Sequence, residues 1–249
     1  MLFAVSNLRK YWGINPVGVL HVGAHEAEEA SDYENESWIP VIWVEGQIDL
    51  ANKLKTRLDP NLHTVLQAFV WDKSGEVLSF KQTNNSQSSS LLDLGSHATD
   101  YPHVKVQEEY TVTTSRLDAT LPTVCNFDLI NLDLQGVEHQ ALVGLGDHIN
   151  KAKWIYTEVN ARHVYKNCTL VKELDQYLKH HQFRRVATRW VWGKGWGDAL
   201  YVHQKVGLPK IYVLQRFYMR LQWLTVSAST KAKQTIWKCA EALRIVNAK

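Results

Sequence analysis

The sequence predicts an α/β fold with a doubly wound, mostly parallel sheet and an antiparallel hairpin at one edge. Apolar strand segments alternate along the chain with amphipathic helical segments, which is typical of such sheets. Several strand segments end in Gly, Glu or Asp, and the last two flank three glycines. Because ligands bind at the carboxyl edge of parallel strands in open α/β folds, these polar ends predict a ligand site there.

The first half of the chain supplies three strands and two helices of this sheet. Leucines at a spacing of four in residues 48–58 indicate an amphipathic helix, which Asp59-Pro60-Asn61 ends. Residues 82–101 are too polar for a regular element, and a loop of that length is usually functional or disordered. The apolar patterns predict strands over 17–24, 41–45 and 63–71, helices over 25–37 and 48–58, and a strand over 76–81 that pairs with the third strand as a hairpin.

The second half of the chain continues the alternation and then closes the sheet. A segment over 104–114 is extended but falls outside the central parallel order. Gly193, Gly195 and Gly197 separate the last two strands, which predicts a terminal hairpin. The expected elements are strands over 127–132 and 154–159, helices over 137–149 and 170–181, and hairpin strands over 183–192 and 198–203.

Charge divides the 249-residue chain into two parts. Residues 206–249 hold eight of the 28 Lys and Arg residues and one of the 25 acidic residues, so this tail carries +7 and the rest −4. We expect one α/β domain over 1–205 and a basic amphipathic helical tail over 206–249. The tail suits peripheral contact with an anionic membrane, or packing on the body or on a second copy of the chain. The acidic body disfavours nucleic acid as a partner.

The cysteine content and the hydropathy of the sequence indicate the cellular compartment in which the protein is expected. Cys125, Cys168 and Cys239 are odd in number and widely spaced, so they predict neither a disulfide framework nor a metal cluster. The sequence has no run of about eighteen apolar residues and no secretory signal pattern. We therefore expect a cytoplasmic protein, which the tail could hold at the inner face of the membrane.

A glycine turn and a carboxylate at the ends of the first two strands predict a nucleoside site. Gly23, Ala24 and His25 form the turn at the end of the first strand, and Glu45 ends the second, where its two oxygens suit the ribose diol. The Gly-x-Gly-x-x-Gly dinucleotide pattern is absent. Four acids within residues 26–32 would oppose a pyrophosphate, whereas a cationic sulfonium ligand carries no such penalty.

Six segments in order make the sequence resemble the FkbM-type methyltransferases over residues 17–203. The segments are Val22-Gly23-Ala24-His25, Val44-Glu45, Ser89-Ser90-Leu91, Arg116-Leu117-Asp118, Asp133-Leu134-Gln135-Gly136-Val137-Glu138 and Trp196-Gly197-Asp198-Ala199-Leu200-Tyr201-Val202. The resemblance implies a class I, Rossmann-like methyltransferase fold, S-adenosyl-L-methionine as cofactor, and O-methylation of a sugar hydroxyl, on a glycan in polysaccharide biosynthesis or on a glycosylated metabolite. The chain departs from the pattern at His21, where an acid is common, and at Ala27, where a glycine is common.

On this resemblance, the cofactor contacts lie at the ends of the first four strands. Gln67 and Ala68 are expected near the adenine, and Asp133 is expected where the methyl group lies. The expected cofactor-binding residues are His21, Gly23, Ala24, His25, Glu45, Gln67, Ala68 and Asp133.

Carboxylates and a histidine after the fourth and fifth strands are the candidates for catalysis. Asp133, Glu158 and His163 could supply a general base, because a neutral alcohol is a poor nucleophile. The same groups could hold a divalent metal such as Mg²⁺, but without a tight acidic cluster we favour a metal-free site. The serine-rich loop could close over cofactor and acceptor. The expected acceptor contacts are Ser89, Ser90, Asn160 and Tyr165.

Two other functions remain open at the level of sequence. One is an NAD-dependent sugar-modifying enzyme on a similar sheet, and the other is a non-catalytic partner subunit that keeps the fold. His21 in place of an acid favours the second. The acceptor could be a free sugar, a nucleotide sugar, a lipid-linked chain or a small metabolite, and nitrogen could replace oxygen as the methylated atom.

Overall fold

The computed structural model describes residues 1–207. The expected helical tail over 206–249 therefore lies, apart from its first two residues, outside the described residues.

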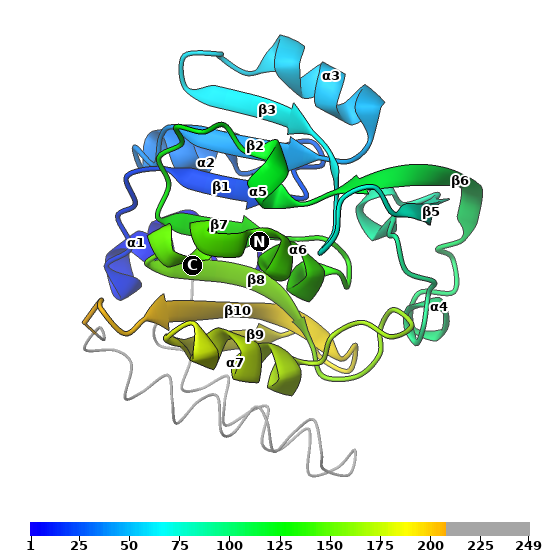
Figure 1. Cartoon of the computed structure of the whole chain (residues 1–249). Coiled ribbons are helices and arrows are strands. Elements are labelled where there is room, and N and C mark those ends of the chain that lie inside the picture. The colour runs from blue at the N-terminus through cyan, green and yellow to red at the C-terminus, as the bar shows by residue number, and fades with distance from the viewer. Residues whose placement is uncertain (208–249) are drawn as a thin grey trace, which may run out of the picture.

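A seven-stranded sheet forms the centre of the molecule, as the sequence predicts (Figure 1). Its strand order is β3-β2-β1-β7-β8-β10-β9. All neighbouring strands pair in parallel except β10, which runs antiparallel to both β8 and β9. The strands are β1 Val19–Val22, β2 Val41–Glu45, β3 His63–Gln67, β7 Leu129–Leu132, β8 Trp154–Asn160, β9 Phe183–Trp190 and β10 Trp196–His203.

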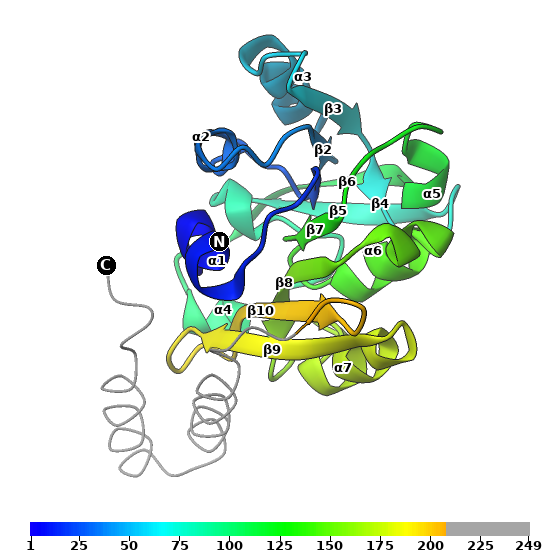
Figure 2. The ribbon, with the colours of Figure 1, turned by 90° about the vertical axis from the view of Figure 1, so that its left-hand side faces the viewer.

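Helices cover both faces of this sheet and bury its apolar side chains (Figure 2). One core cluster joins α1, α2 and α3 to one face, and the other joins α5, α6 and α7 to the opposite face. Because both faces are buried, β1 and β2 have no exposed residue, as expected for parallel strands. The helices are α1 Val5–Trp12, α2 Ala30–Asn35, α3 Ile48–Arg57, α5 Leu117–Thr120, α6 Glu138–Gly144 and α7 Val171–His180.

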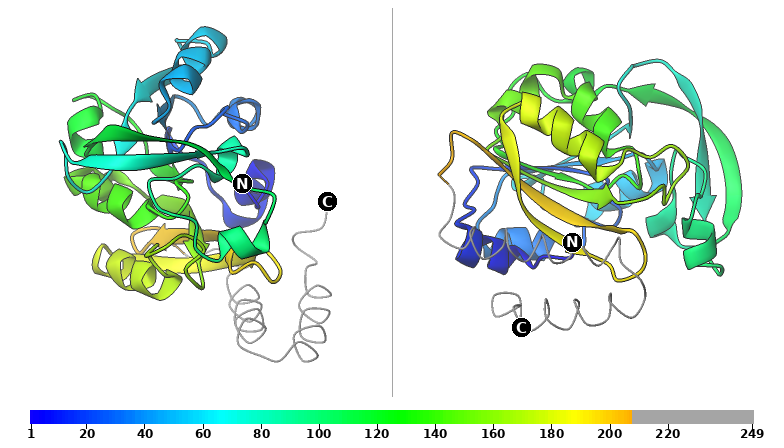
Figure 3. Two further views of the ribbon diagram at one scale, coloured as in Figure 1. Left: turned by 90° about the vertical axis from the view of Figure 1, so that its right-hand side faces the viewer. Right: turned by 90° about the horizontal axis from the view of Figure 1, so that it is seen from below.

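A second, three-stranded sheet corrects one prediction of the sequence analysis. The expected strand over 63–71 ends at Gln67, and Phe69–Val70 leaves it as β4 to join β6, Val106–Ser115. The segment expected to be the hairpin partner of the third strand is β5, Val77–Thr83, which pairs with β6 instead. This sheet lies beyond the carboxyl ends of the central strands, beside the site described below (Figure 3).

Helix boundaries differ from the predictions where the backbone turns locally. The helix expected over 25–37 begins only at Ala30, since His25 (φ 46°) and Ala27 (φ 50°) have left-handed backbone that a helix does not allow. The helix expected over 137–149 ends at Gly144, followed by a 3₁₀ segment, Gly146–Lys151.

Several short elements have no counterpart in the predictions. The polar segment 82–101 contains a 3₁₀ turn, Ser86–Ser88, and the short helix α4, His97–Asp100. The short helices α1 and α5 are not among the predicted elements either, although Val5, Leu8 and Trp12 bury one face of α1 at helical spacing.

Candidate active site

A cavity of about 590 Å³ opens at the carboxyl edge of the central sheet. Its walls come from the ends of β1, β2, β7 and β8, from the 85–91 segment and from α4. Six acidic residues line it, and none of the described lining residues is Lys or Arg. The six are Glu28, Glu29, Glu45, Asp133, Glu158 and Asp198. The negative charge of this cavity favours a cationic ligand and disfavours a phosphate.

Glu45 presents a fixed carboxylate at the end of β2. Its Oε2 accepts a hydrogen bond from the His25 amide at 2.7 Å, and its Oε1 accepts one from the Gln47 amide at 2.8 Å. Burial raises the pKa of Glu45, although the backbone hydrogen bonds oppose the rise. Each oxygen keeps a further lone pair, so the carboxylate can also accept hydrogen bonds from both hydroxyls of a ribose. The residues present therefore fit an adenosyl cofactor.

Gly23 ends β1 in a conformation that only glycine adopts easily. Its φ is 86°, and a Cβ placed there would lie 1.9 Å from the carbonyl oxygen of Asp133. A glycine is thus required at position 23 because the backbone after β7 passes so close to it. A ligand that lies against the turn would be a second reason for a glycine.

We expect Gly23→Ala to lower the free energy of unfolding by about 2 kcal/mol or more, because strain and a backbone clash coincide. Gly75→Ala is the matched control, since Gly75 has a similar φ of 84° but a Cβ at that position would meet no atom within 4 Å. Urea unfolding should show a clearly smaller loss for the control. Equal losses of unfolding free energy in the two variants would show that a small backbone shift relieves the clash with Asp133 at little energetic cost.

His21 is a buried neutral base below the cavity, on the face of β1 opposite the α6 layer. Its ring lies 4.7 Å from the Trp43 ring, and its Nδ1 is 3.3 Å from the Tyr33 hydroxyl. Burial lowers the pKa of His21 to about 4, so the ring is uncharged at neutral pH. His21 therefore lines the cavity without supplying the negative charge that an acid at this position would bring.

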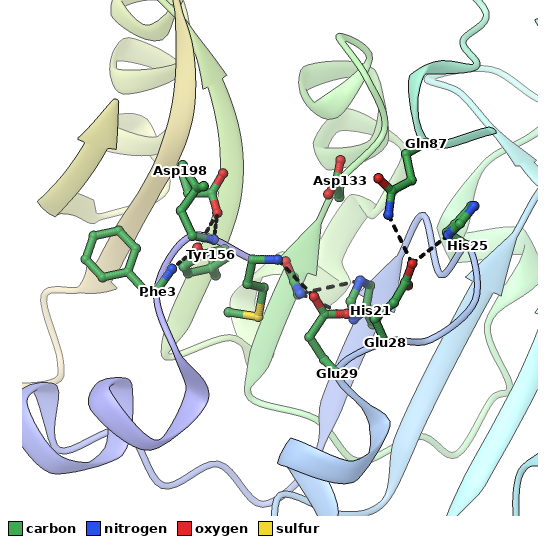
Figure 4. Close-up of polar contacts among 12 residues, drawn as sticks. Phe3, His21, His25, Glu28, Glu29, Gln87, Asp133, Tyr156 and Asp198 are labelled. Atoms are coloured by element: carbon green, nitrogen blue, oxygen red, sulfur yellow. Dashed lines mark hydrogen bonds and ion pairs between the residues drawn. The ribbon is translucent and has the colours of Figure 1, made fainter. Parts of the chain in front are cut away.

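Glu29 supplies a carboxylate close to His21 (Figure 4). Its Oε1 lies 2.9 Å from the amino group of Met1. Burial alone would raise the pKa of Glu29, but His21 in its protonated form and this amino group, by its charge and its hydrogen bond, outweigh burial, so the net pKa is lowered. The contact shows that Glu29 can bind an ammonium group within the cavity.

Asp198 and Tyr156 join the first residues of the chain to the same wall (Figure 4). The Leu2 amide donates to Asp198 Oδ2 at 2.6 Å, and the Phe3 amide donates to the Tyr156 hydroxyl at 3.0 Å. The Tyr156 hydroxyl in turn donates to Asp198. Residues 2 and 3 are thus hydrogen-bonded to side chains of β8 and β10.

Gln135 bridges two candidate catalytic carboxylates. Its Nε2 donates to Asp133 Oδ1 at 2.6 Å and lies 3.3 Å from Glu158 Oε2, while its Oε1 accepts a hydrogen bond from the Tyr165 hydroxyl at 2.6 Å. Asp133 opens onto the cavity, and desolvation there, followed by the charge of Asp198, raises its pKa to about 6. Burial and the neighbouring acids also raise the pKa of Glu158 well above its ordinary value. The pair can therefore take up a proton near neutral pH.

Glu138 fixes the backbone between the carboxylates and α6. Its Oε1 accepts hydrogen bonds from the amides of Leu134 and Gly136, at 3.0 and 3.1 Å. This holds the turn in which Gln135 (φ 55°) and Gly136 (φ 106°) both have left-handed backbone. Burial raises the pKa of Glu138 to about 7.

The serine-rich segment lies against both halves of the cavity. Ser86 Oγ is 2.8 Å from His25 Nε2, and Ser90 Oγ donates to the Gln135 carbonyl at 2.8 Å. Ser89 also lines the cavity, and its Oγ accepts a hydrogen bond from the Thr83 amide at 3.1 Å. In this structure the segment forms a wall of the cavity.

The structure brings most of the sequence-predicted residues to one cavity. The lining set contains His21, Gly23, Ala24, His25, Glu45, Ala68, Ser89, Ser90, Asp133, Glu158 and Tyr165.

Three further predicted residues lie outside the lining set. His163 is exposed, with its Nδ1 3.1 Å from the Cys168 carbonyl, and Gln67 donates to the Gly46 carbonyl at 2.6 Å. Asn160 is buried at the end of β8, where its side chain interacts with Glu158.

Several lining residues are not predicted as site residues by the sequence analysis. The sequence pattern places Glu28 and Glu29 at a helix start, and Asp198 in a hairpin strand. Asp198 stands opposite Glu158 in the β10–β8 register, so the antiparallel pairing is the signal that could place it. No such signal exists for His97 and Tyr101, because their position depends on how the 82–101 segment folds back.

No group of three or more His, Cys, Asp and Glu side chains suited to a metal ion occurs within residues 1–207. In the same range, no helix is both long and apolar enough to cross a membrane.

Comparison with known proteins identifies the family. The model of the methyltransferase FkbM domain matches residues 21–185, which is more than half of the chain. The chain belongs to this family. It is therefore an S-adenosylmethionine-dependent methyltransferase with a Rossmann-like fold, as the resemblance implied. A search of curated proteins finds no match to this methyltransferase.

Solved structures similar to this methyltransferase are distant. They include a protein of the NADB-Rossmann superfamily from Streptococcus agalactiae (13% identity, covering 97% of this chain and 96% of that one, TM-score 0.45). The M1A22 tRNA methyltransferase TrmK of B. subtilis shows 8% identity over 98% and 97% of the two chains, with a TM-score of 0.45. A ribosomal protein L11 methylase from Lactobacillus delbrueckii subsp. bulgaricus shows 12% identity over 80% and 76%, with a TM-score of 0.44. Similarities at this level carry no information about the substrate.

Proposed function

We propose that this methyltransferase methylates a hydroxyl oxygen of a sugar, on a glycan or on a glycosylated metabolite. The observation that carries the proposal is the pair of carboxylates in the cavity wall, Asp133 and the buried Glu158, which Gln135 bridges. A hydroxyl acceptor needs a base within hydrogen-bond reach, and an acid with a raised pKa is a better base than an ordinary carboxylate. The FkbM family membership supports a sugar as the carrier of that hydroxyl.

The residues divide into two roles. Glu45 would accept hydrogen bonds from the ribose hydroxyls of S-adenosylmethionine. The Gly23–His25 turn would let the backbone lie close to the cofactor. The cofactor supplies an electrophilic methyl group on a sulfonium. Asp133 would accept the hydroxyl proton as the oxygen–carbon bond forms, with Gln135 orienting its carboxylate. Holding acceptor and cofactor in line provides the remaining rate enhancement.

The experiment that tests this function is a transfer assay with tritium-labelled S-adenosylmethionine and a panel of glycans. We expect label in a base-stable methyl ether on sugar oxygen, located by linkage analysis. Label found on nitrogen, on tRNA or on protein would show that this group is the acceptor and would refute the proposed methylation of a sugar hydroxyl.

Turnover should depend on pH through the carboxylate pair. Asp133 acts as a base only when ionised, and desolvation in the cavity raises its pKa to about 6. The rate should therefore be low below this pH, rise through it and level off above it. Because Asp133 and Glu158 interact, the profile reports the pair and not one residue. A rate that is flat from about pH 5 to about pH 8 would remove the pair from the chemical step.

We propose that Glu29 binds the amino group of the cofactor's methionine moiety, which would displace the Met1 amino group that Glu29 holds in this structure. Glu29 would then supply the negative charge that an acid at the position of His21 would otherwise bring. Glu29→Gln should weaken binding of S-adenosylhomocysteine about tenfold, since hydrogen bonds to a charged group are among the stronger ones. Binding of methylthioadenosine, which lacks the amino group, should not change. Glu26→Gln is the control, because Glu26 pairs with Lys53 and does not line the cavity. Equal losses for both ligands would refute this role.

A further inference from the structure

Four aromatic or imidazole side chains gather at the end of the cavity beyond the carboxylate pair. The ring of His97 lies 4.8 Å from that of Tyr101 and 5.5 Å from that of Tyr165. Trp196 Nε1 donates to the Tyr101 hydroxyl at 3.2 Å. All four line the same cavity as Glu45 and Asp133. They come from α4 and the residue after it, from the segment after β8 and from the start of β10.

This group is directly connected to the candidate catalytic residues. The Tyr165 hydroxyl donates to Gln135 Oε1 at 2.6 Å, and Gln135 Nε2 donates to Asp133 at 2.6 Å. A ligand that packs against Tyr165 and His97 would therefore lie close to the proposed base. Glu45, which would bind the ribose, is at the end of β2, across β1 and β7 from this group.

His97 offers a polar atom that has no partner in the protein. The residue is 6% exposed, and its Nδ1 is buried without a hydrogen bond. Burial lowers the pKa of His97, so the ring is neutral near pH 7. Buried polar groups are normally satisfied, so an unpaired nitrogen on a ring that lines the cavity is suited to a ligand hydroxyl once the ring turns toward it.

The position of α4 is fixed from outside the cavity. The amides of Gly95 and His97 both donate to the Val164 carbonyl, at 2.9 and 3.1 Å. Lys194 Nζ donates to the Asp100 carbonyl at 2.8 Å, and Arg162 forms an ion pair with the Asp100 carboxylate. Neither of these two cations belongs to the cavity lining, so they hold the wall from outside. Lys194 Nζ lies 4.5 Å from the centroid of the Tyr101 ring and so supports this side of the subsite.

We propose that His97, Tyr101, Tyr165 and Trp196 form an acceptor subsite for an uncharged sugar ring, and that the cavity rejects sugars with a phosphate next to that ring. This inference rests on the proposed sugar O-methylation. Aromatic walls with a few placed polar groups suit a ring that has apolar C–H faces and hydroxyl edges. A phosphate would face Asp133 and Glu158 in a described lining that holds no Lys or Arg. The Met1 amino group also lines the cavity, but it is already paired with Glu29.

The test is a calorimetric titration of protein saturated with S-adenosylhomocysteine. The probes are neutral methyl hexosides and methyl 6-deoxyhexosides, with the phosphorylated counterpart of each hexoside beside it. We expect at least one neutral glycoside to bind, and its phosphorylated counterpart to bind at least about tenfold more weakly, which corresponds to a modest electrostatic penalty.

Variants locate the subsite. Trp196→Ala and His97→Ala should weaken binding of the neutral glycoside about tenfold and leave the affinity for S-adenosylhomocysteine unchanged. Trp192→Ala is the matched control on the same hairpin, since Trp192 is 40% exposed and does not line the cavity. His97→Phe keeps the ring packing if His97→Ala unfolds, and it should show the same loss through the missing nitrogen.

Each other outcome overturns a defined part of the proposal. Equal or tighter binding of the phosphorylated sugars would refute the uncharged subsite and leave sugar methylation standing. A parallel loss of S-adenosylhomocysteine affinity in the His97 and Trp196 variants would assign these residues to the cofactor. Binding of S-adenosylhomocysteine without binding of any sugar in the panel would refute the sugar acceptor and the subsite together.

Discussion

Asp133→Asn should lower kcat by on the order of a hundredfold to ten-thousandfold, the range in which general bases contribute. The amide keeps the size of the side chain but cannot accept the proton of the acceptor hydroxyl. It can still accept the hydrogen bond from Gln135, so the wall of the cavity should keep its shape. The affinity for S-adenosylhomocysteine should be mostly unchanged, and single-turnover kinetics beside calorimetry measure the two quantities.

Two comparisons make this result specific to Asp133. Asp147→Asn, at an exposed position outside the cavity, should keep full turnover. Glu158→Gln should also slow turnover, because Glu158 shares the bridge through Gln135 and interacts electrostatically with Asp133. If Asp133→Asn turns over at the wild-type rate, Asp133 is not the base.

Glu45→Ala should weaken S-adenosylhomocysteine binding by about a hundredfold or more, since two hydrogen bonds to one buried carboxylate are lost. The mutation also removes the hydrogen-bond acceptor of the His25 and Gln47 amides, so part of the lost affinity would reflect a displaced backbone and not the missing ribose contact. The analogue of S-adenosylhomocysteine that lacks the ribose 2′-hydroxyl separates the two effects. Its affinity should fall less on mutation, and an unchanged affinity for the full ligand would remove Glu45 from the site.

Much of the fold could be predicted because each central strand carries its own signal. Val41–Glu45 is apolar and ends in an acid, and its observed bounds equal the predicted ones. The second sheet could not be predicted, because 76–81 looks the same whether it pairs with the third strand or with the distant 106–115 segment. Pairing between segments far apart in sequence depends on tertiary packing, which local patterns do not report.

The same limit applies to the candidate site. Gly23, Glu45 and Asp133 lie at the ends of predicted strands, so the sequence alone predicts them at one edge, and all three line the cavity. His163 follows β8 as well, but the chain turns after Asn160 and leaves its side chain exposed outside the cavity. His97 enters the cavity only because the Gly95 and His97 amides bind the Val164 carbonyl, a contact that no local pattern indicates.

The most direct test of the methyltransferase site is a calorimetric titration of the purified, folded protein with S-adenosylhomocysteine, beside NAD⁺ as a second ligand. The acidic cavity and the fixed Glu45 carboxylate predict micromolar binding of S-adenosylhomocysteine and no binding of NAD⁺, whose pyrophosphate would meet uncompensated acids. Binding of NAD⁺ would contradict this assignment of the cavity and favour a nicotinamide-dependent enzyme. Binding of neither ligand would contradict it as well, and would favour a non-catalytic partner subunit.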